Sequence, residues 1–453
     1  MQMNMESSFL NGLTGKVIAP YSKEYGEARQ EWNRAIQKFP LVIVYCYETE
    51  DVCNAIAWAR CYHVGIRIRS GRHHYEGYST GNLVLVIDVS PMKGIKLDKA
   101  NHTLCIQSGA ANQEVYNYAG AEGYPFPGGT CPTVGVVGYT LGGGWGYSSR
   151  FLGLGCDSLI ELEIVNYQGK VLRVNEREHA DLFWACKGAG GGNFGVVTAM
   201  TFQLPPKIAG VTLVELEYLK TSPDTMVSFL DTWQKWLSDL DDRMTLNASI
   251  YNSADAGLGI YGRGLFYGSP DEAAEILQPF ERIEGAIINL EAMTFLEAMQ
   301  KIQEGYPESE KFKSTGRFTD RQYNLAELRK IVELIGQRPE GSVYAAVSVY
   351  ALGGKVRAVA KRETAFYYRD ATYILGIQSV WEKSKYAAAN ISWVQKRFKY
   401  LKAITKGSYI NFPYSCLKNY EKEYYGENAR KLRQINKKYD PRNVFNFPQA
   451  IKK

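Results

Sequence analysis

The sequence predicts an α+β fold in two parts. A chain of 453 residues exceeds what a single hydrophobic core usually holds. Before Pro205-Pro206, short apolar strands alternate with short helices and many glycines, and after it longer strand patterns alternate with helical ones. The second pattern is typical of an antiparallel sheet whose helices cover one face. We expect the other, open face to meet the substrate.

The first part begins as a β-α-β unit. Residues 40–47 form a continuous β-branched and aromatic run, which predicts a buried strand. Thr49 is a candidate N-cap of a helix that Gly65 would end, and residues 66–69 begin the next strand. Further patterns predict a strand at 83–89, a hairpin at 94–108, a helix at 112–124, a hairpin of 159–165 with 170–174, and a strand at 196–204.

The second part contains five strand patterns and three helical ones. Strands are predicted at 211–219, 245–251, 257–267, 343–350 and 373–380, and helices at 224–240, 271–283 and 385–404. Just before this part, Gly190, Gly192 and Gly195 spell the glycine pattern of dinucleotide-binding folds. A short helix precedes them and a strand follows, the reverse of what that fingerprint needs, so we do not expect a Rossmann domain.

The composition of the chain argues against several classes of function. A net charge of +6 spread over the chain without a basic run gives no reason to expect nucleic acid as a partner. No run of 18 apolar residues and no signal-peptide pattern in residues 1–13 are found, so we expect no membrane span and a cytoplasmic location. The eight cysteines form no C-x-x-C pair, and the five histidines include no ligand-spaced pair, so no metal site is expected.

Three stretches of the sequence contain the candidate residues for binding a cofactor. Residues 128–150 are dense in glycine, which lets main-chain N–H groups approach a large anionic ligand, and Cys131 stands at their start. Residues 67–77 follow a strand pattern and place His73 among cations and glycines. Residues 181–198 read Asp-Leu-Phe-Trp-Ala-Cys-Lys-Gly-Ala-Gly-Gly-Gly-Asn-Phe-Gly-Val-Val-Thr. Each stretch alone could be a flexible loop with a packed histidine or thiol.

Together, the Arg-Ser-Gly-x-His, Cys-Pro-Thr-Val-Gly and Gly-Gly-Asn-Phe-Gly-Val-Val motifs resemble the berberine bridge enzyme-like branch of the vanillyl-alcohol oxidase flavoprotein family. The resemblance runs from about residue 40 to the C-terminus, in the family's order. It implies an FAD-binding domain of the PCMH type over residues 1–206, with a core of about 36–206. It further implies a substrate-binding domain over 207–406 and a C-terminal segment, 407–453, that returns to the FAD domain.

The resemblance also implies that FAD is bound covalently at two residues. His73 matches the histidine that bonds to the flavin 8-methyl carbon, and Cys131 matches the cysteine that bonds to ring carbon 6. His74 is the competitor for the histidine role. The other residues placed at the cofactor are Arg69, Ser70, Gly71, Arg72, His74, Thr133, Val134, Gly135, Gly138, Tyr139, Gly142, Gly143, Asn193, Gly195, Val196 and Asn411.

Three positions depart from the family pattern. Arg72 replaces a glycine and could pair with the FAD pyrophosphate, or lie in solvent. Tyr139 replaces a histidine that in relatives reaches the flavin ribityl region. Trp145 replaces a common tyrosine, which removes a hydroxyl and supplies an indole face for a sugar or aromatic ring.

For catalysis, the resemblance points to Tyr409 in Tyr-x-Asn as the general base. A phenol has a pKa of about 10, so we expect a nearby lysine or arginine to lower it. Ungapped counting places Gly376 where relatives carry a polar residue above the flavin. Gln378 lies on the same face of the predicted strand and could substitute for it.

The family resemblance therefore implies an FAD-linked oxidase. It would oxidise an alcohol by hydride transfer to flavin N5 and reduce dioxygen to hydrogen peroxide, with Val134 at the position that gates oxygen. A sugar, an oligosaccharide and a secondary metabolite all remain open as substrate. The alternative is a flavin-bearing structural protein with little turnover, such as a spore-coat component.

Overall fold

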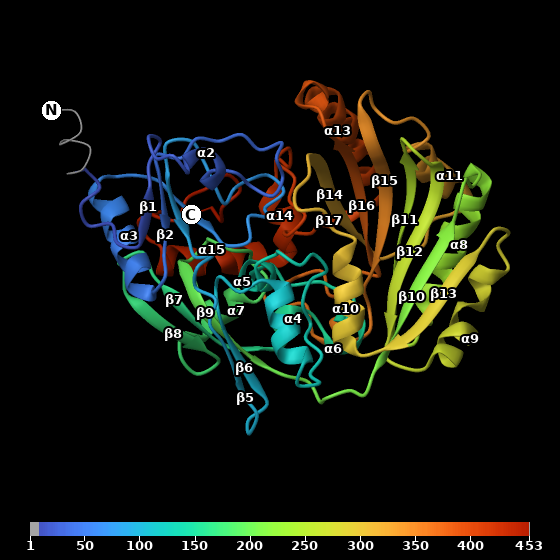
Figure 1. The fold of residues 1–453 in the computed structure, drawn as a ribbon, viewed down its shortest axis with the longest axis horizontal. Coiled ribbons are helices and arrows are strands. Elements are labelled where there is room, and N and C mark those ends of the chain that lie inside the picture. The colour runs from blue at the N-terminus through green and yellow to red at the C-terminus, as the bar shows by residue number, and fades with distance from the viewer. Residues whose placement is uncertain (1–8, 453) are drawn as a thin grey trace.

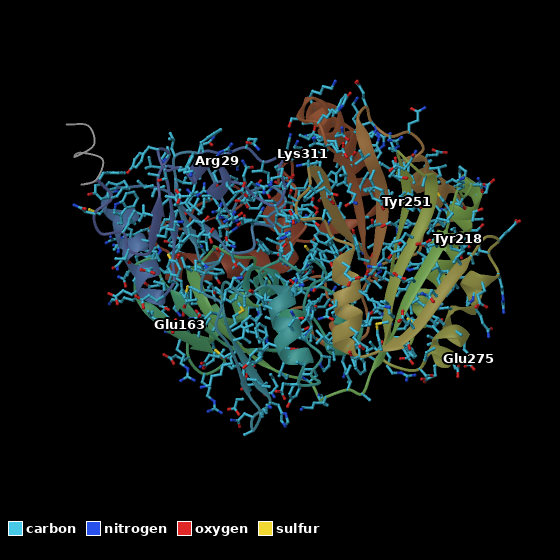
Figure 2. The ribbon with its side chains drawn as sticks, in the orientation of Figure 1. Arg29, Glu163, Tyr218, Tyr251, Glu275 and Lys311 are labelled. Atoms are coloured by element: carbon cyan, nitrogen blue, oxygen red, sulfur yellow. The ribbon has the colours of Figure 1, made fainter. Side chains whose placement is uncertain are left out.

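The computed structural model describes residues 9–452 and forms two halves that lie side by side (Figure 1). Among these residues, no helix combines the length and apolar character needed to cross a membrane. Figure 2 shows side chains filling the space between the ribbons, with Glu163 labelled in the first half and Tyr251 on the large sheet of the second.

A four-stranded sheet opens the first half. Its order is β1 (Lys16–Ile18), β2 (Val42–Tyr45), β4 (Leu85–Asp88) and β3 (Ile66–Arg69). Strands β2 and β3 each pair in parallel with β4, which therefore lies between them. Helix α3 (Thr49–Cys61) packs against this sheet, and a short helix, α2 (Tyr25–Ala28), precedes β2.

The prediction that Thr49 caps α3 and Gly65 ends it is wrong. Glu48 occupies the N-cap position, and its main-chain N–H donates to the Asp51 carboxylate. Helix α3 ends at Cys61, before Gly65 is reached. An acidic side chain in the first turn supplied the cap that sequence reasoning assigned to a hydroxyl.

The second sheet of the first half is antiparallel throughout. Its order is β5 (Ile95–Asp98), β6 (Thr103–Gln107), β9 (Val196–Gln203), β7 (Leu159–Val165) and β8 (Val171–Asn175), which confirms both predicted hairpins. Helices α4 (Asn112–Gly120), α5 (Val136–Leu141), α6 (Ser149–Leu152) and α7 (Ala180–Cys186), with the 3-10 turn η1 (Gly155–Asp157), complete this half.

An eight-stranded antiparallel sheet dominates the second half. Its order is β13 (Ile287–Met293), β10 (Val211–Tyr218), β12 (Gly257–Phe266), β11 (Met244–Ser253), β15 (Ser342–Ala351), β16 (Tyr373–Trp381), β14 (Phe312–Thr319) and β17 (Lys406–Ser408). One face packs on α8 (Pro223–Ser238), α9 (Pro270–Glu281), α11 (Leu325–Glu333) and α13 (Ala387–Ile404) in a shared apolar core. The opposite face is turned toward the first half.

The five predicted strands of this sheet are confirmed, but the sequence analysis did not predict β13, β14 and β17. Strand β14 is buried although it is rich in polar residues, so it lacks apolar periodicity. Its Arg317 is satisfied by hydrogen bonds to Ser408 and Glu423, which allows that burial. The expected domain boundary between residues 406 and 407 falls inside β17, a strand of this sheet.

The C-terminal segment returns to the first half. Helix α15 (Ala429–Tyr439) packs with α7, and Asn436 donates to the Asn193 main chain. The remaining elements are α10 (Phe295–Glu304), α12 (Lys355–Ala358), α14 (Tyr420–Tyr425), η2 (Ser384–Tyr386) and η3 (Gly426–Asn428). A largely buried ion pair of Lys313 on β14 with Glu76 also ties the halves together.

Candidate functional site

A cavity of about 610 Å³ lies between the glycine-rich loops of the first half and the open face of the eight-stranded sheet. The loops that carry His73 and Cys131 form one wall. Residues of five sheet strands form the other wall, among them Tyr261, Ser348 and Gln378. Volumes of this size are typical of sites for small molecules and cofactors.

His73 and Cys131 meet in this cavity. His73 Nε2 lies 3.9 Å from Cys131 Sγ, although 58 positions separate them in the chain. The two loops interlock through glycine: a Cβ on Gly71 would stand 2.4 Å from the Gly135 nitrogen, and one on Gly135 would stand 2.6 Å from the Ser70 hydroxyl. Only glycine permits this approach.

The His73 ring is held on two sides. Trp32 stacks on it with a centroid distance of 4.9 Å, and Thr133 Oγ1 lies 2.7 Å from Nε2. Burial lowers the pKa of His73 to about 3, so the imidazole is neutral near pH 7. The competitor, His74, accepts a hydrogen bond from the Glu76 main chain, and burial lowers its pKa to about 4.

Burial also shifts the pKa of the Cys131 thiol. The thiol is almost fully buried, and burial raises its pKa, although hydrogen bonds from the Thr133 hydroxyl and from the main chains of Thr133 and Val134 act in the opposite direction. The thiolate is the nucleophilic form of cysteine, so these hydrogen bonds favour reaction.

The cavity walls fit a large ligand with polar and aromatic parts. A side chain added at Gly138 would meet no other atom within 4 Å, so space is open in front of that glycine. Three buried nitrogens of lining residues lack a hydrogen-bond partner among the described residues: Trp32 Nε1, Arg67 Nε and Asn247 Nδ2. Buried donors are normally hydrogen-bonded in folded proteins, and FAD offers acceptors for them on its phosphates, ribityl chain and ring.

The structure brings most of the expected cofactor residues to the cavity. Besides His73 and Cys131, the lining includes Arg69, Ser70, Gly71, Arg72, His74, Val134, Gly135, Gly138, Tyr139, Asn193, Gly195 and Asn411. Thr133 lies next to the lining through its contact with His73.

Three expected cofactor residues contact protein rather than the cavity. Val196 is fully buried in the core of the first half. A Cβ on Gly142 would overlap the Asn411 side chain, and one on Gly143 would overlap Phe366. These glycines are needed because the C-terminal segment and the loop 365–370 approach them closely, which the motif alone does not reveal.

Both arginines of the Arg-Ser-Gly-x-His motif, Arg69 and Arg72, already donate hydrogen bonds to protein groups. The Arg69 guanidinium is fully buried and donates to Asp88, Glu31 and the Ala28 carbonyl, so its side chain is already bound by protein groups. Arg72 adopts a positive φ of 65°, and its Nη2 donates to the Tyr45 hydroxyl at 2.9 Å.

The other two departures from the motif pattern also bond to protein. The Tyr139 hydroxyl donates to the Pro127 carbonyl at 3.2 Å. Trp145 Nε1 donates to the Ala351 carbonyl at 2.9 Å, which fixes the indole in the cavity wall beside Tyr350.

Tyr409 lies just below the cavity wall and is fully buried. Its oxygen accepts hydrogen bonds from the Trp145 N–H and the Asn411 amide, both at 3.1 Å. The expectation that a cation lowers its pKa is wrong. Burial raises the pKa of Tyr409 to about 12, the hydrogen bonds oppose this only in part, and among the described residues no lysine or arginine contributes.

Gln378 lies on β16 and lines the cavity, as expected from its strand face. At Gly376, two residues away, a Cβ would stand 2.9 Å from the Tyr350 ring. The aromatic ring therefore fills the place that a side chain at 376 would take.

Sequence reasoning missed Glu310, the only carboxylate among the described residues that line the cavity. Its main chain bridges the halves, since its N–H donates to the Trp32 carbonyl and its carbonyl accepts from Arg34. Burial raises the pKa of Glu310 to about 7. It lies outside every motif, directly before a strand that was itself not predicted, so no sequence signal marked it.

Comparisons with known proteins identify the family of the chain. A family model described as an FAD binding domain matches residues 40–175, and one described as berberine and berberine like matches residues 408–452. The chain is 35% identical to the FAD-linked oxidoreductase YgaK of Bacillus subtilis, over 97% of both chains.

Two of the solved structures that share the fold illustrate the similarity. BBE-like 1 of Physcomitrella patens superposes with a TM-score of 0.90 at 25% identity, over 98% of each chain. The glucooligosaccharide oxidase of Acremonium strictum, described with 6-S-cysteinyl, 8α-N1-histidyl FAD, superposes with a TM-score of 0.90 at 23% identity, also over 98% of each chain.

Proposed function

This chain belongs to the berberine bridge enzyme-like family of FAD-linked oxidoreductases, and on that premise we propose that it is an oxidase that carries bicovalently bound FAD and oxidises an alcohol. The observation that carries the proposal is the pairing of His73 and Cys131 at 3.9 Å in one cavity. Covalent attachment at both residues would hold the cofactor in an open site that admits a bulky substrate.

Protein groups around the pair would hold the rest of FAD. The open space at Gly138 leaves room beside helix α5, and Arg67 Nε, which has no hydrogen-bond partner among the described residues, supplies a donor in the wall. Main-chain N–H groups of the glycine-rich segment can approach phosphate or ring oxygens without hindrance from side chains. Among the described residues, no cluster of His, Cys, Asp or Glu is placed to hold a metal.

When bound, the flavin supplies an acceptor for the hydride that leaves the carbinol carbon. The protein must then take the hydroxyl proton, and we assign this role to Tyr409. The two hydrogen-bond donors on its oxygen, Trp145 N–H and the Asn411 amide, stabilise the phenolate. Both donors belong to residues that line the cavity, so Tyr409 contacts the cavity wall, and we propose that its oxygen reaches the substrate hydroxyl there.

The open sheet face would bind the substrate. Trp145, Tyr350 and Phe412 offer aromatic surface, while Gln378, Ser348 and Asn247 offer hydrogen-bonding groups. Stacking surface next to polar groups suits a hydroxyl-bearing ring. We therefore place the substrate among sugars, oligosaccharides and ring-containing secondary metabolites, and dioxygen as the electron acceptor that yields hydrogen peroxide.

An anaerobic titration tests this function. The purified yellow protein is mixed with a panel of sugars, oligosaccharides and aromatic alcohols, and the flavin absorption is followed. Bleaching by at least one compound, with return of the colour and release of hydrogen peroxide on admission of air, is the expected result. A flavin that stays oxidised with every compound would instead favour a flavin-bearing structural protein.

A further inference from the structure

Thr133 lies between the two expected attachment residues. Its hydroxyl oxygen is 2.7 Å from His73 Nε2 and 3.8 Å from Cys131 Sγ. The interlocked glycines, Gly71 and Gly135, fix the two loops in this register. One hydroxyl is therefore placed to act on two nucleophiles that come from different parts of the chain.

Two arrangements of hydrogens satisfy both contacts, and only in one of them does Thr133 donate to the sulfur and so favour the thiolate. In that arrangement His73 donates its Nε2–H to Thr133 Oγ1, and the Thr133 hydroxyl donates to Cys131 Sγ. In this arrangement the lone pair of the neutral His73 ring is on Nδ1, because the proton is held on Nε2. The same hydroxyl stabilises the thiolate of Cys131, in line with its effect on the pKa of that thiol.

We propose, on the basis of the bicovalent attachment inferred above, that Thr133 is the positioning residue that prepares both attachment atoms, His73 Nδ1 and Cys131 Sγ. Trp32 contributes by stacking on the His73 ring and so restricting its rotation. The two attachments are coupled through one side chain.

The chemistry balances with dioxygen as oxidant. At His73, a bond forms from Nδ1 to the flavin 8-methyl carbon while that carbon and Nε2 each lose one hydrogen. At Cys131, a bond forms from Sγ to ring carbon 6 while the thiol and that carbon each lose one hydrogen. In each case two electrons pass through the flavin ring to dioxygen, which takes up the two protons as hydrogen peroxide. A free Nδ1 lone pair and a stabilised thiolate are what the protein contributes.

The test compares Thr133→Val, Thr133→Ser and Thr140→Val. Flavin-free protein from riboflavin-starved cells is mixed with FAD in air, and samples are acid-denatured at intervals. Tryptic peptides that carry flavin are then quantified for each attachment residue. Thr140 provides the matched control because its buried hydroxyl has no hydrogen-bond partner among the described residues and does not line the cavity.

Thr133→Val should slow attachment at both His73 and Cys131 by about tenfold, the effect of one lost hydrogen bond. Thr133→Ser should restore both rates, and Thr140→Val should leave both unchanged. A readout independent of turnover is the ¹⁵N spectrum of His73 in flavin-free protein. The wild type should show the Nε2–H tautomer, and Thr133→Val should show a mixture.

Attachment by Thr133→Val at the wild-type rate at either residue would overturn the coupling, and so would an unchanged tautomer. Those results would leave the proposed function intact. A wild type that binds FAD without any covalent bond would instead overturn the bicovalent proposal itself, and the role of Thr133 with it.

Discussion

His73 and Cys131 lie on two loops that approach each other through their glycines, so that Nε2 and Sγ are 3.9 Å apart. This contact depends on main-chain packing rather than on the two side chains. Substitutions of these glycines should therefore disturb the site, although the glycines themselves take no part in the reaction.

Gly71→Ala should destabilise the protein. The new methyl group would stand 2.4 Å from the Gly135 nitrogen and 2.5 Å from the Thr133 carbonyl oxygen, both parts of the main chain. Overpacking of this kind costs about 1–3 kcal/mol, and thermal unfolding of flavin-free protein measures it.

Gly138→Ala is the matched control for that change. Its methyl group would meet no atom within 4 Å and would lie in helix α5, so flavin-free protein should keep or gain stability. The same methyl group lies in the cavity and should weaken FAD binding. Equal unfolding temperatures for the Gly71→Ala protein and the wild type would contradict the interlocked packing.

Val134→Leu should slow the reaction of the reduced flavin with dioxygen. Val134 lines the cavity in the loop that follows Cys131, and a longer side chain there would narrow the approach to the cofactor. Stopped-flow mixing of the reduced protein with aerated buffer measures this rate, with anaerobic flavin reduction as the control that should not change. Equal reoxidation rates would show that Val134 only packs.

Tyr409→Phe should slow flavin reduction by about 10² to 10⁴, because positioned proton transfer typically contributes that much. In the wild type the rate should rise with pH across the alkaline range, since burial raises the pKa of Tyr409 to about 12 and only the phenolate accepts a proton. The Phe variant should lose this rise while substrate binding changes little. A Tyr409→Phe protein whose flavin is reduced at nearly the wild-type rate would show that Tyr409 is not the base. Gln378 or another residue of the cavity would then have to take the proton.

Glu310→Gln should stabilise the protein more at pH 8 than at pH 5. Burial raises the pKa of this carboxyl from 4.5 to about 7 in the folded state. The folded protein therefore binds the proton more tightly than the unfolded chain, and wild-type stability falls as the pH rises from about 4.5 through 7. The full shift corresponds to about 3 kcal/mol.

Thermal unfolding of Glu310→Gln and the wild type at the two pH values measures this difference. Glu308→Gln is the control, because Glu308 is exposed in the same segment. A difference in unfolding temperature that does not grow with pH would show that Glu310 is solvated.

The sequence predicted those parts of the fold that apolar periodicity marks. The strands β2, β3 and β7 carry continuous or alternating apolar residues and lie where they were expected. Strand β14 was missed because Arg317 and its polar neighbours are buried through tertiary hydrogen bonds, which no local pattern reports.

The site likewise contains residues that local sequence motifs indicate and residues that only the folded chain brings together. His73 and Cys131 stand in recognisable motifs, and the sequence indicated both. Glu310 and Trp32 contribute through positions that only the folded chain brings to the cavity. The raised pKa of Tyr409 also depends on tertiary burial, so sequence reasoning expected a cation that the structure does not place there.

Acid denaturation of the purified protein, followed by filtration, tests most directly whether FAD is covalently bound. Wild-type protein should stay yellow, His73→Ala and Cys131→Ala should each retain the flavin through the remaining bond, and the double variant should release it. Flavin that passes the filter from the denatured wild type would contradict covalent attachment of the cofactor at His73 and Cys131.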